Sequence, residues 1–166
     1  MDAPVVVAIN GNAGGAGLGL ALSGDYAMAS SEARFVSAYT ASGLTPDAAT
    51  TYLLAKYVGL LRAKELILTN RSLTAEEACD WGMLNKVVHP DKLMQEALGL
   101  AATLAAGPTK AFGASKRLLT TAFSASMETQ LEFESASITN IVRTTSDARD
   151  AITTFLNRQQ PEFKGK

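Results

Sequence analysis

The glycine-rich stretch from Asn10 to Leu22, NGNAGGAGLGLAL, is the feature that most constrains how this chain can fold. The β-branched run Val5–Ile9 just before it predicts a short buried strand. The glycines allow backbone conformations that a Cβ would penalise, and the leucines after Gly17 predict a helix. A strand, a glycine turn and a helix in this order aim free N–H groups and the positive end of a helix dipole at one point. We expect a partially negative group to bind there.

The known phosphate-binding motifs do not fit this stretch. The dinucleotide pattern G-x-G-x-x-G fails because Leu20 stands where its last glycine should be, and a P-loop fails because Leu20 and Ala21 follow Gly19. The chain also has no G-x-S-x-G nucleophile elbow. An oxyanion is therefore a better candidate than a phosphate. On these residues alone, an ordinary tight turn between strand and helix remains the alternative.

Length and charge exclude several classes of protein. The 166 residues suit one domain, and a net charge of −1 without a basic cluster argues against nucleic acid or an anionic membrane surface as partner. Residues 3–24 are uncharged, but they contain six glycines and have no basic residue before them, which argues against a membrane span or a signal peptide.

The few cysteine and histidine residues add two expectations. Cys79 is the only cysteine, which excludes an internal disulfide and fits a reducing, cytoplasmic location. His89 is the only histidine, so we predict no His-rich metal site.

The predicted secondary structure changes along the chain from a mixture of strands and helices to helices alone. We expect strands at 26–29 and 34–36, a polar loop at 37–46, and a helix that starts at Thr45-Pro46-Asp47 through a hydroxyl cap, a proline and a first-turn carboxylate. A capping box, Thr74 to Glu77, opens another short helix. Four helices follow at 91–106, 109–123, 125–143 and from 146. The third carries an apolar stripe that should be buried against another element or subunit, namely Met127, Leu131, Ile138 and Val142.

Several long segments resemble the enoyl-CoA hydratase/isomerase (crotonase) family. They are APVVVAINGNAGGAGLGLALSGDYAMAS, then ARF, then GLTPDAATTYLLAKYVGLLRAKELILTNRSLTAEEACDWGMLNKVV, and the closing QQPEFKGK. The resemblance covers essentially the whole chain. It implies an α/β, crotonase-like fold: residues 1–90 as the C-terminal part of the ββα spiral core, and residues 91–166 as a helical oligomerisation region that forms a homotrimer or a dimer of trimers.

The resemblance also implies that an N-terminal part is missing. Family members carry a segment before the stretch that opens here, and that segment supplies the first oxyanion N–H and much of the CoA-binding surface. We therefore expect this chain to lack half of the oxyanion hole, and positioned groups of a site act as a unit.

The family's chemistry transfers to only some positions of this chain. The resemblance implies acyl-CoA thioesters as substrates, with coenzyme A as part of the substrate and no separate cofactor. The second oxyanion N–H falls on Ala16, with Gly15 and Gly17 beside it. The two glutamates of the hydratases match Gly19 and Tyr39, neither of which can transfer the proton, so we do not expect hydratase activity and place Tyr39 among the substrate-binding residues.

Asp47 is the remaining carboxylate at a catalytic position of the family. In the isomerases an acid here moves a proton between the carbons flanking a double bond, and in 4-chlorobenzoyl-CoA dehalogenases an aspartate here attacks the aromatic ring. The alternative is a structural role for Asp47, because a carboxylate in the first turn stabilises a helix through its interaction with the helix dipole. A catalytic role would need a pKa raised by burial, which Leu44 and Tyr39 could supply.

Two residues of the C-terminal tail complete the predicted site. Phe163 and Lys164 match positions that contact the CoA adenine and phosphates of a neighbouring subunit, with a solvated, mobile tail as the alternative. Three hypotheses follow for the chain: an enoyl-CoA isomerase that works through a thioester enolate, an aryl-CoA dehalogenase or hydrolase with Asp47 as nucleophile, or an inactive truncated module that only oligomerises or binds CoA weakly.

Overall fold

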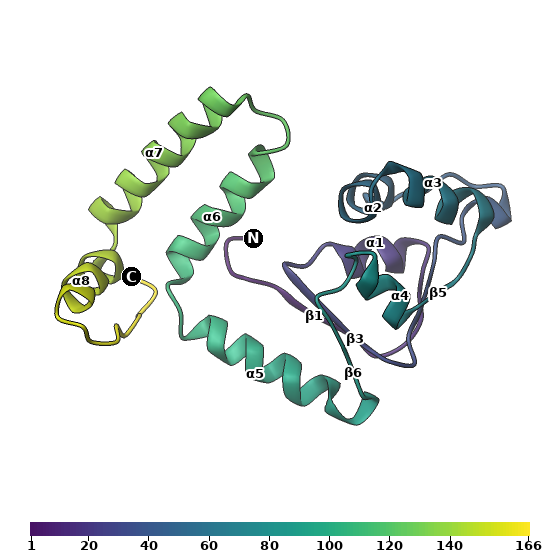
Figure 1. Cartoon of the computed structure of the whole chain (residues 1–166), viewed down its shortest axis with the longest axis horizontal. Helices are drawn as coiled ribbons and strands as arrows, with labels where there is room; N and C mark the ends of the chain where they lie inside the picture. The colour runs from purple at the N-terminus through teal and green to yellow at the C-terminus, as the bar shows by residue number, and fades with distance from the viewer. The chain divides into compact units, whose positions relative to one another are not determined.

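The computed structural model describes all residues from Met1 to Lys166, and they form two compact units (Figure 1). One unit is Val5–Leu100, and the other combines Met1–Pro4 with Ala101–Lys166. No helix is both long enough and apolar enough to cross a bilayer.

The first unit holds all the strands and the shorter helices. In chain order it contains β1 (Val6–Ile9), β2 (Ala13–Gly14), α1 (Ala16–Leu22), β3 (Tyr26–Ser30), β4 (Arg34–Val36), the 3₁₀ turn Thr40–Ser42, α2 (Thr50–Val58), α3 (Leu60–Thr69), β5 (Leu73–Thr74), α4 (Ala75–Asp80), β6 (Lys86–Val88) and the 3₁₀ turn Pro90–Lys92. Helix α5 (Leu93–Ala105) begins in this unit. The strands predicted at 26–29 and 34–36 are confirmed.

The main sheet consists of three parallel strands in the order β1-β3-β6 (Figure 1). Successive side chains of a strand point to opposite faces. Ala27 and Ala29 of β3 accordingly join the core formed with helices α1 to α4, whereas Met28 joins a second cluster with Leu93 and Ala97 of α5. Because both faces of β3 are covered, a strand without charged residues is required there.

A second, smaller sheet fixes the glycine turn. Strand β2 pairs in parallel with β4, and β5 pairs antiparallel with β4. The β4–β5 pair places Phe35 opposite Leu73, and both side chains are fully buried. On the other side of β4, a Cβ at Gly14 would lie only 3.2 Å from Cγ1 of Val36. The segment before α1 is therefore held tightly against the end of β4.

The helix start predicted at Thr45-Pro46-Asp47 is wrong. Helix α2 begins at Thr50, because Ala48 (φ 49°) and Ala49 (φ 58°) both adopt the left-handed conformation and separate Asp47 from the helix. Asp47 instead closes a turn in which its carbonyl accepts a hydrogen bond from the Thr50 N–H (2.9 Å). The helix-dipole explanation for Asp47 therefore does not apply.

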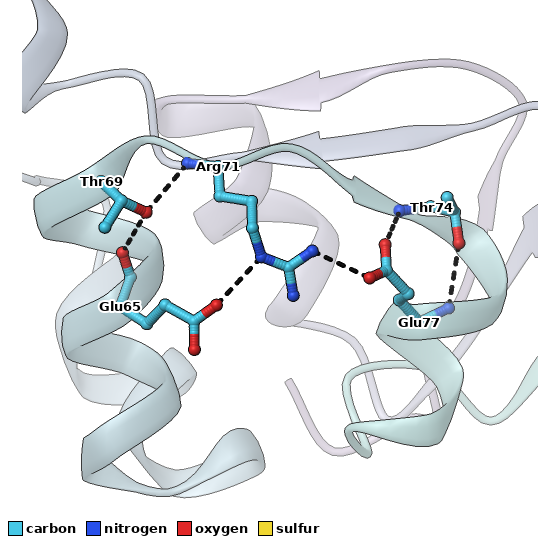
Figure 2. A network of polar contacts seen from close by, with 5 residues as sticks. All are labelled: Glu65, Thr69, Arg71, Thr74 and Glu77. Carbon is cyan, nitrogen blue, oxygen red and sulfur yellow. Dashed lines mark hydrogen bonds and ion pairs between the residues drawn. The ribbon is translucent and has the colours of Figure 1, made fainter.

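The capping box at the start of α4 is confirmed and belongs to a larger polar network (Figure 2). The Thr74 hydroxyl accepts from the Glu77 N–H (3.1 Å), and the Glu77 carboxylate accepts from the Thr74 N–H (2.9 Å). Arg71 donates to Glu77 (2.8 Å) and to Glu65 of α3 (2.9 Å). One guanidinium thus connects the middle of α3 to the first turn of α4.

The second unit is helical, with α6 (Thr109–Thr121), α7 (Met127–Thr144) and α8 (Ser146–Leu156). Helices α6 and α7 form an antiparallel hairpin (Figure 1), in which Gln130 donates to the Leu118 carbonyl (3.0 Å). These helices expose many large apolar side chains, including the predicted stripe of α7: Leu119, Phe123, Met127, Leu131, Phe133, Ile138, Val142, Ile152, Phe155 and Leu156.

The network around Glu77 predicts a pH-dependent part of the stability. The Thr74 N–H and then Arg71 hold the pKa of Glu77 below its ordinary value of 4.5. A lowered pKa in the folded state means that the stabilisation is complete above pH 4.5 and is lost as the pH falls through the folded-state pKa. Glu77→Gln should therefore reduce the acid-dependent fall in the free energy of unfolding, measured by urea denaturation across the acidic range. Glu76→Gln, an exposed neighbour in the same turn, is the control and should keep the wild-type dependence.

Candidate active site

The turn before α1 depends on Gly15. This residue has φ 56° and ψ −131°, a conformation that side chains rarely tolerate. Its N–H donates to the carbonyls of Val36 (3.3 Å) and Ser37 (3.2 Å) just after β4. Ala16 and Gly17 come next, as the first two residues of α1, and their N–H groups have no acceptor within the helix. The structure therefore offers Ala16 and Gly17, rather than Gly15, as donors at this turn.

Tyr39 connects this turn to Asp47. A Cβ at Gly15 would lie 3.8 Å from Cζ of the Tyr39 ring, so the ring lies directly over the glycine. The Tyr39 hydroxyl donates a hydrogen bond to the Asp47 carboxylate. Two segments that follow β4 thus converge on the glycine turn. Five of the predicted residues belong to one constellation: Gly15, Ala16, Gly17, Tyr39 and Asp47.

The hydrogen bond between Tyr39 and Asp47 also changes the acidity of the phenol. It raises the pKa of Tyr39 above its ordinary value of 10.0, and partial burial of the ring acts in the same direction. The cause is that an ionised phenolate would lose the donated hydrogen bond and would repel the carboxylate. Tyr39 therefore acts as a hydrogen-bond donor that orients Asp47.

The surroundings of Asp47 differ from those expected. The Asp47 residue is exposed, and the side chain expected to help bury it, Leu44, is itself 61% exposed. The prediction of an apolar wall from Leu44 is wrong, because the left-handed turn at 48–49 carries this segment along the surface of the unit. Tyr39 is the one expected neighbour that the structure confirms.

Gly19, at the position of a hydratase glutamate, is closed off by the turn that follows Asp47. A Cβ there would lie 2.4 Å from the Ala48 carbonyl oxygen and 2.8 Å from Oγ1 of Thr50. A glutamate at residue 19 would therefore require that the Asp47-bearing turn move. No local pattern points to Thr50, whose side chain is fully buried here, because only the fold brings α2 onto α1.

The two remaining predicted residues are not part of the first unit. Phe163 and Lys164 belong to the second unit, where Phe163 is half-buried and Lys164 is exposed. His, Cys, Asp and Glu side chains form no group of three that could hold a metal ion.

Comparison with known proteins identifies the family of this chain. The family model for enoyl-CoA hydratase/isomerase matches residues 1–166. The chain belongs to the enoyl-CoA hydratase/isomerase family. Its fold is that of the crotonases: a crystal structure of enoyl-CoA hydratase from Bacillus anthracis superimposes with a TM-score of 0.91 at 30% identity, covering 98% of this chain and 63% of that one.

Curated members of the family carry several activities. The chain is 39% identical to 1,2-epoxyphenylacetyl-CoA isomerase of Escherichia coli, over 98% of its own length and 62% of that protein. It is 37% identical to 4-chlorobenzoyl coenzyme A dehalogenase-1 of Arthrobacter, over 81% of its own length and 49% of that protein. The chain thus spans less than two thirds of the length of these relatives.

Two glycines of α1 give a matched test of the close approach between Gly19 and the Ala48 carbonyl in the turn after Asp47. Gly19→Ala should lower the free energy of unfolding by about 1–3 kcal/mol, the usual cost of overpacking, because its Cβ meets the Ala48 backbone. Gly17→Ala meets nothing within 4 Å. It should leave stability unchanged or raise it by up to about 1 kcal/mol through helix propensity. Urea denaturation measures both, and equal effects would contradict the packing described.

The hydrogen bond between Tyr39 and Asp47 can be followed by titration. With tyrosine Cζ labelled by ¹³C, NMR should show the Tyr39 pKa above 10.0 in the wild type. Asp47→Asn should lower this pKa, since the carboxylate that accepts the hydrogen bond is gone. Asp80→Asn changes an exposed carboxylate of α4 and should leave the raised pKa in place. A Tyr39 pKa that does not respond to Asp47→Asn would show that the pair is not formed in solution.

Proposed function

We propose that this chain carries the thioester-enolate site of an acyl-CoA isomerase in which Asp47 moves a proton between the two carbons flanking an enoyl double bond. The observation that supports this most is the hydrogen bond from Tyr39 to Asp47 beside the Gly15 turn. It supports the proposal because enolate chemistry requires a carboxylate together with amide donors, and the Tyr39 ring lies over Gly15, directly before the Ala16 and Gly17 N–H groups.

The proposed reaction has two proton transfers. The Asp47 carboxylate takes a proton from the α-carbon of a 3-enoyl thioester. The electron pair left on this carbon delocalises onto the thioester carbonyl oxygen and, through the double bond, onto the γ-carbon. The Ala16 N–H donates a hydrogen bond to this oxyanion. A donor of this kind stabilises the transition state by about 3 kcal/mol. Protonated Asp47 then returns the proton to the γ-carbon, which gives the conjugated 2-enoyl thioester and restores the carboxylate.

The contacts of Gly19 and Tyr39 favour this one-carboxylate reaction over hydration. Hydration in this family uses two glutamates, and here the first position is closed by the Ala48 carbonyl while the second holds a phenol. We assign Tyr39 the task of orienting Asp47 and lining the acyl site. The 39% identity to an isomerase of a CoA thioester is consistent with this assignment.

Aryl-CoA dehalogenation, with Asp47 as nucleophile, is the second candidate. It is supported by the 37% identity to a 4-chlorobenzoyl coenzyme A dehalogenase and by the exposure of Asp47, which leaves the carboxylate open to a ring carbon. The hydrogen bond from Tyr39 counts against it, because a carboxylate oxygen that accepts a hydrogen bond is a weaker nucleophile than a free one.

The helical unit supports assembly into a homotrimer or a dimer of trimers. The exposed stripe of α7 includes Met127, Leu131 and Ile138, and Leu131 and Ile138 also line a groove of about 490 Å³ between α6 and α7. Exposed apolar faces of this extent are typical of protein interfaces. In such an assembly we assign Phe163 and Lys164 to the adenine and phosphates of CoA bound by a neighbouring copy, with no separate cofactor.

Proton exchange provides the direct test of the proposal. The wild-type chain should exchange the α-protons of an acyl-CoA in D₂O and convert 3-enoyl-CoA to its conjugated isomer, followed by mass spectrometry. Asp47→Asn should slow both reactions by roughly 10²–10⁴-fold, the usual contribution of a general base, and Asp80→Asn should not change them.

Each other outcome points to one of the remaining hypotheses. Conversion of 3-enoyl-CoA that survives Asp47→Asn would exclude Asp47 as the proton carrier. Chloride release from 4-chlorobenzoyl-CoA would favour the dehalogenase. If the wild-type chain is inert with both substrates, the isomerase proposal fails for this chain, and only CoA binding or oligomerisation remains to be measured.

A further inference from the structure

Asp147, in the first turn of α8, holds the C-terminal tail rather than the helix alone. Its carboxylate is buried, with 4% of the residue exposed. One oxygen accepts from the Lys164 N–H (2.9 Å) and the other from the Gly165 N–H (2.8 Å). The Asp147 N–H in turn donates to the Lys166 carbonyl (3.3 Å). Hydrogen bonds from backbone amides to an ionised carboxylate are among the stronger ones in proteins, so these three contacts form a clasp between residue 147 and residues 164–166.

The tail is also fitted against a second helix. Gly165 adopts φ 67°, and a Cβ at this residue would lie 2.8 Å from Oγ1 of Thr109 at the start of α6. The chain therefore passes through a left-handed residue in close contact with α6 just after Lys164. Next to these two attachments, the Lys164 side chain remains exposed and Phe163 is half-buried. The clasp fixes the backbone and leaves the ammonium group available.

We infer that Asp147 is a positioning residue for CoA recognition: it holds the tail in the conformation that presents Phe163 and Lys164 to the nucleotide part of the substrate. This inference rests on the proposed acyl-CoA function. A free tail would lose backbone entropy on binding, whereas a tail that is already ordered avoids most of that loss. Asp147 touches no reacting atom, so it should affect the affinity for CoA and leave the proton transfer at Asp47 unchanged.

The test compares a ligand that has the nucleotide with one that lacks it. In Asp147→Asn the side-chain amide faces one of the two backbone donors, so one of the two hydrogen bonds is lost. Calorimetry should show roughly tenfold weaker binding of an acyl-CoA and unchanged binding of the matching acyl-pantetheine. General damage to the fold would weaken both ligands. Asp150→Asn, an exposed carboxylate on the same helix, is the control and should bind both ligands like the wild type.

Hydrogen exchange shows whether the clasp is formed, independently of the affinity for acyl-CoA. The Lys164 and Gly165 amides should be protected in the wild type and exchange freely in Asp147→Asn, with α8 still protected. Lys164→Ala should keep the clasp and its protection but lose affinity for acyl-CoA. The double variant should bind no more weakly than the weaker single variant, because both substitutions remove the same contact.

Three results would overturn the inference. The first is that the tail amides exchange freely in Asp147→Asn while the affinity for acyl-CoA is unchanged. This result would not contradict the proposed function. The second is a wild-type chain that binds acyl-CoA no better than acyl-pantetheine. The third is a wild-type chain that binds neither ligand, in which case the proposed function fails as well. If Asp147→Asn does not fold, Gly165→Ala strains the same tail without changing the carboxylate and should give the same loss of acyl-CoA affinity.

Discussion

The close approach of Gly19 to the Ala48 carbonyl determines what this site can contain. With only a hydrogen at residue 19, α1 and the turn after Asp47 can meet at a separation that no side chain would allow. The turn then passes through two left-handed alanines, which is a costly conformation for residues other than glycine. This contact brings Asp47 to Tyr39 and at the same time removes the space for a second carboxylate. In the proposed mechanism, the absence of a side chain at Gly19 is therefore what favours a reaction with one carboxylate over a reaction with two.

The rest of the first unit keeps this contact in place. The glycine turn is held by the pairing of β2 with β4 and by the Gly15 N–H, which donates to the Val36 and Ser37 carbonyls. Because Tyr39 lies only a few residues after β4, the same strand that fixes the turn also fixes the phenol. The Ala16 and Gly17 amides and the aspartate therefore depend on one small sheet for their relative position, a rigid support of the kind that precise sites require.

Local patterns predicted much of the fold but only part of the site. Strands β1, β3 and β4, the capping box at Thr74 and the α1 start depend on neighbours within a few residues, and the sequence identifies them. The two-residue strands β2 and β5 were not predicted. The helix start predicted at 45–47 was wrong because residues 48–49 pack closely against Gly19, far away in the sequence, and an alanine gives no local sign of a positive φ. A local pattern also does not decide which helix face is buried, since the large apolar side chain of Leu68 in α3 is 72% exposed.

Two aspartates show why a local rule cannot assign a role to a carboxylate. Asp47 follows a proline and a hydroxyl cap, the pattern of a helix start, yet it lies outside the helix and accepts from the Tyr39 hydroxyl. Asp147 does lie in the first turn of a helix, where the dipole alone would account for it, yet both of its oxygens are occupied by amides 17 and 18 residues away. In each case a donor that is distant in sequence decides the orientation of the carboxylate. The roles that we propose follow from that donor and from its segment: the acyl site for Asp47, and the tail residues Phe163 and Lys164 for Asp147.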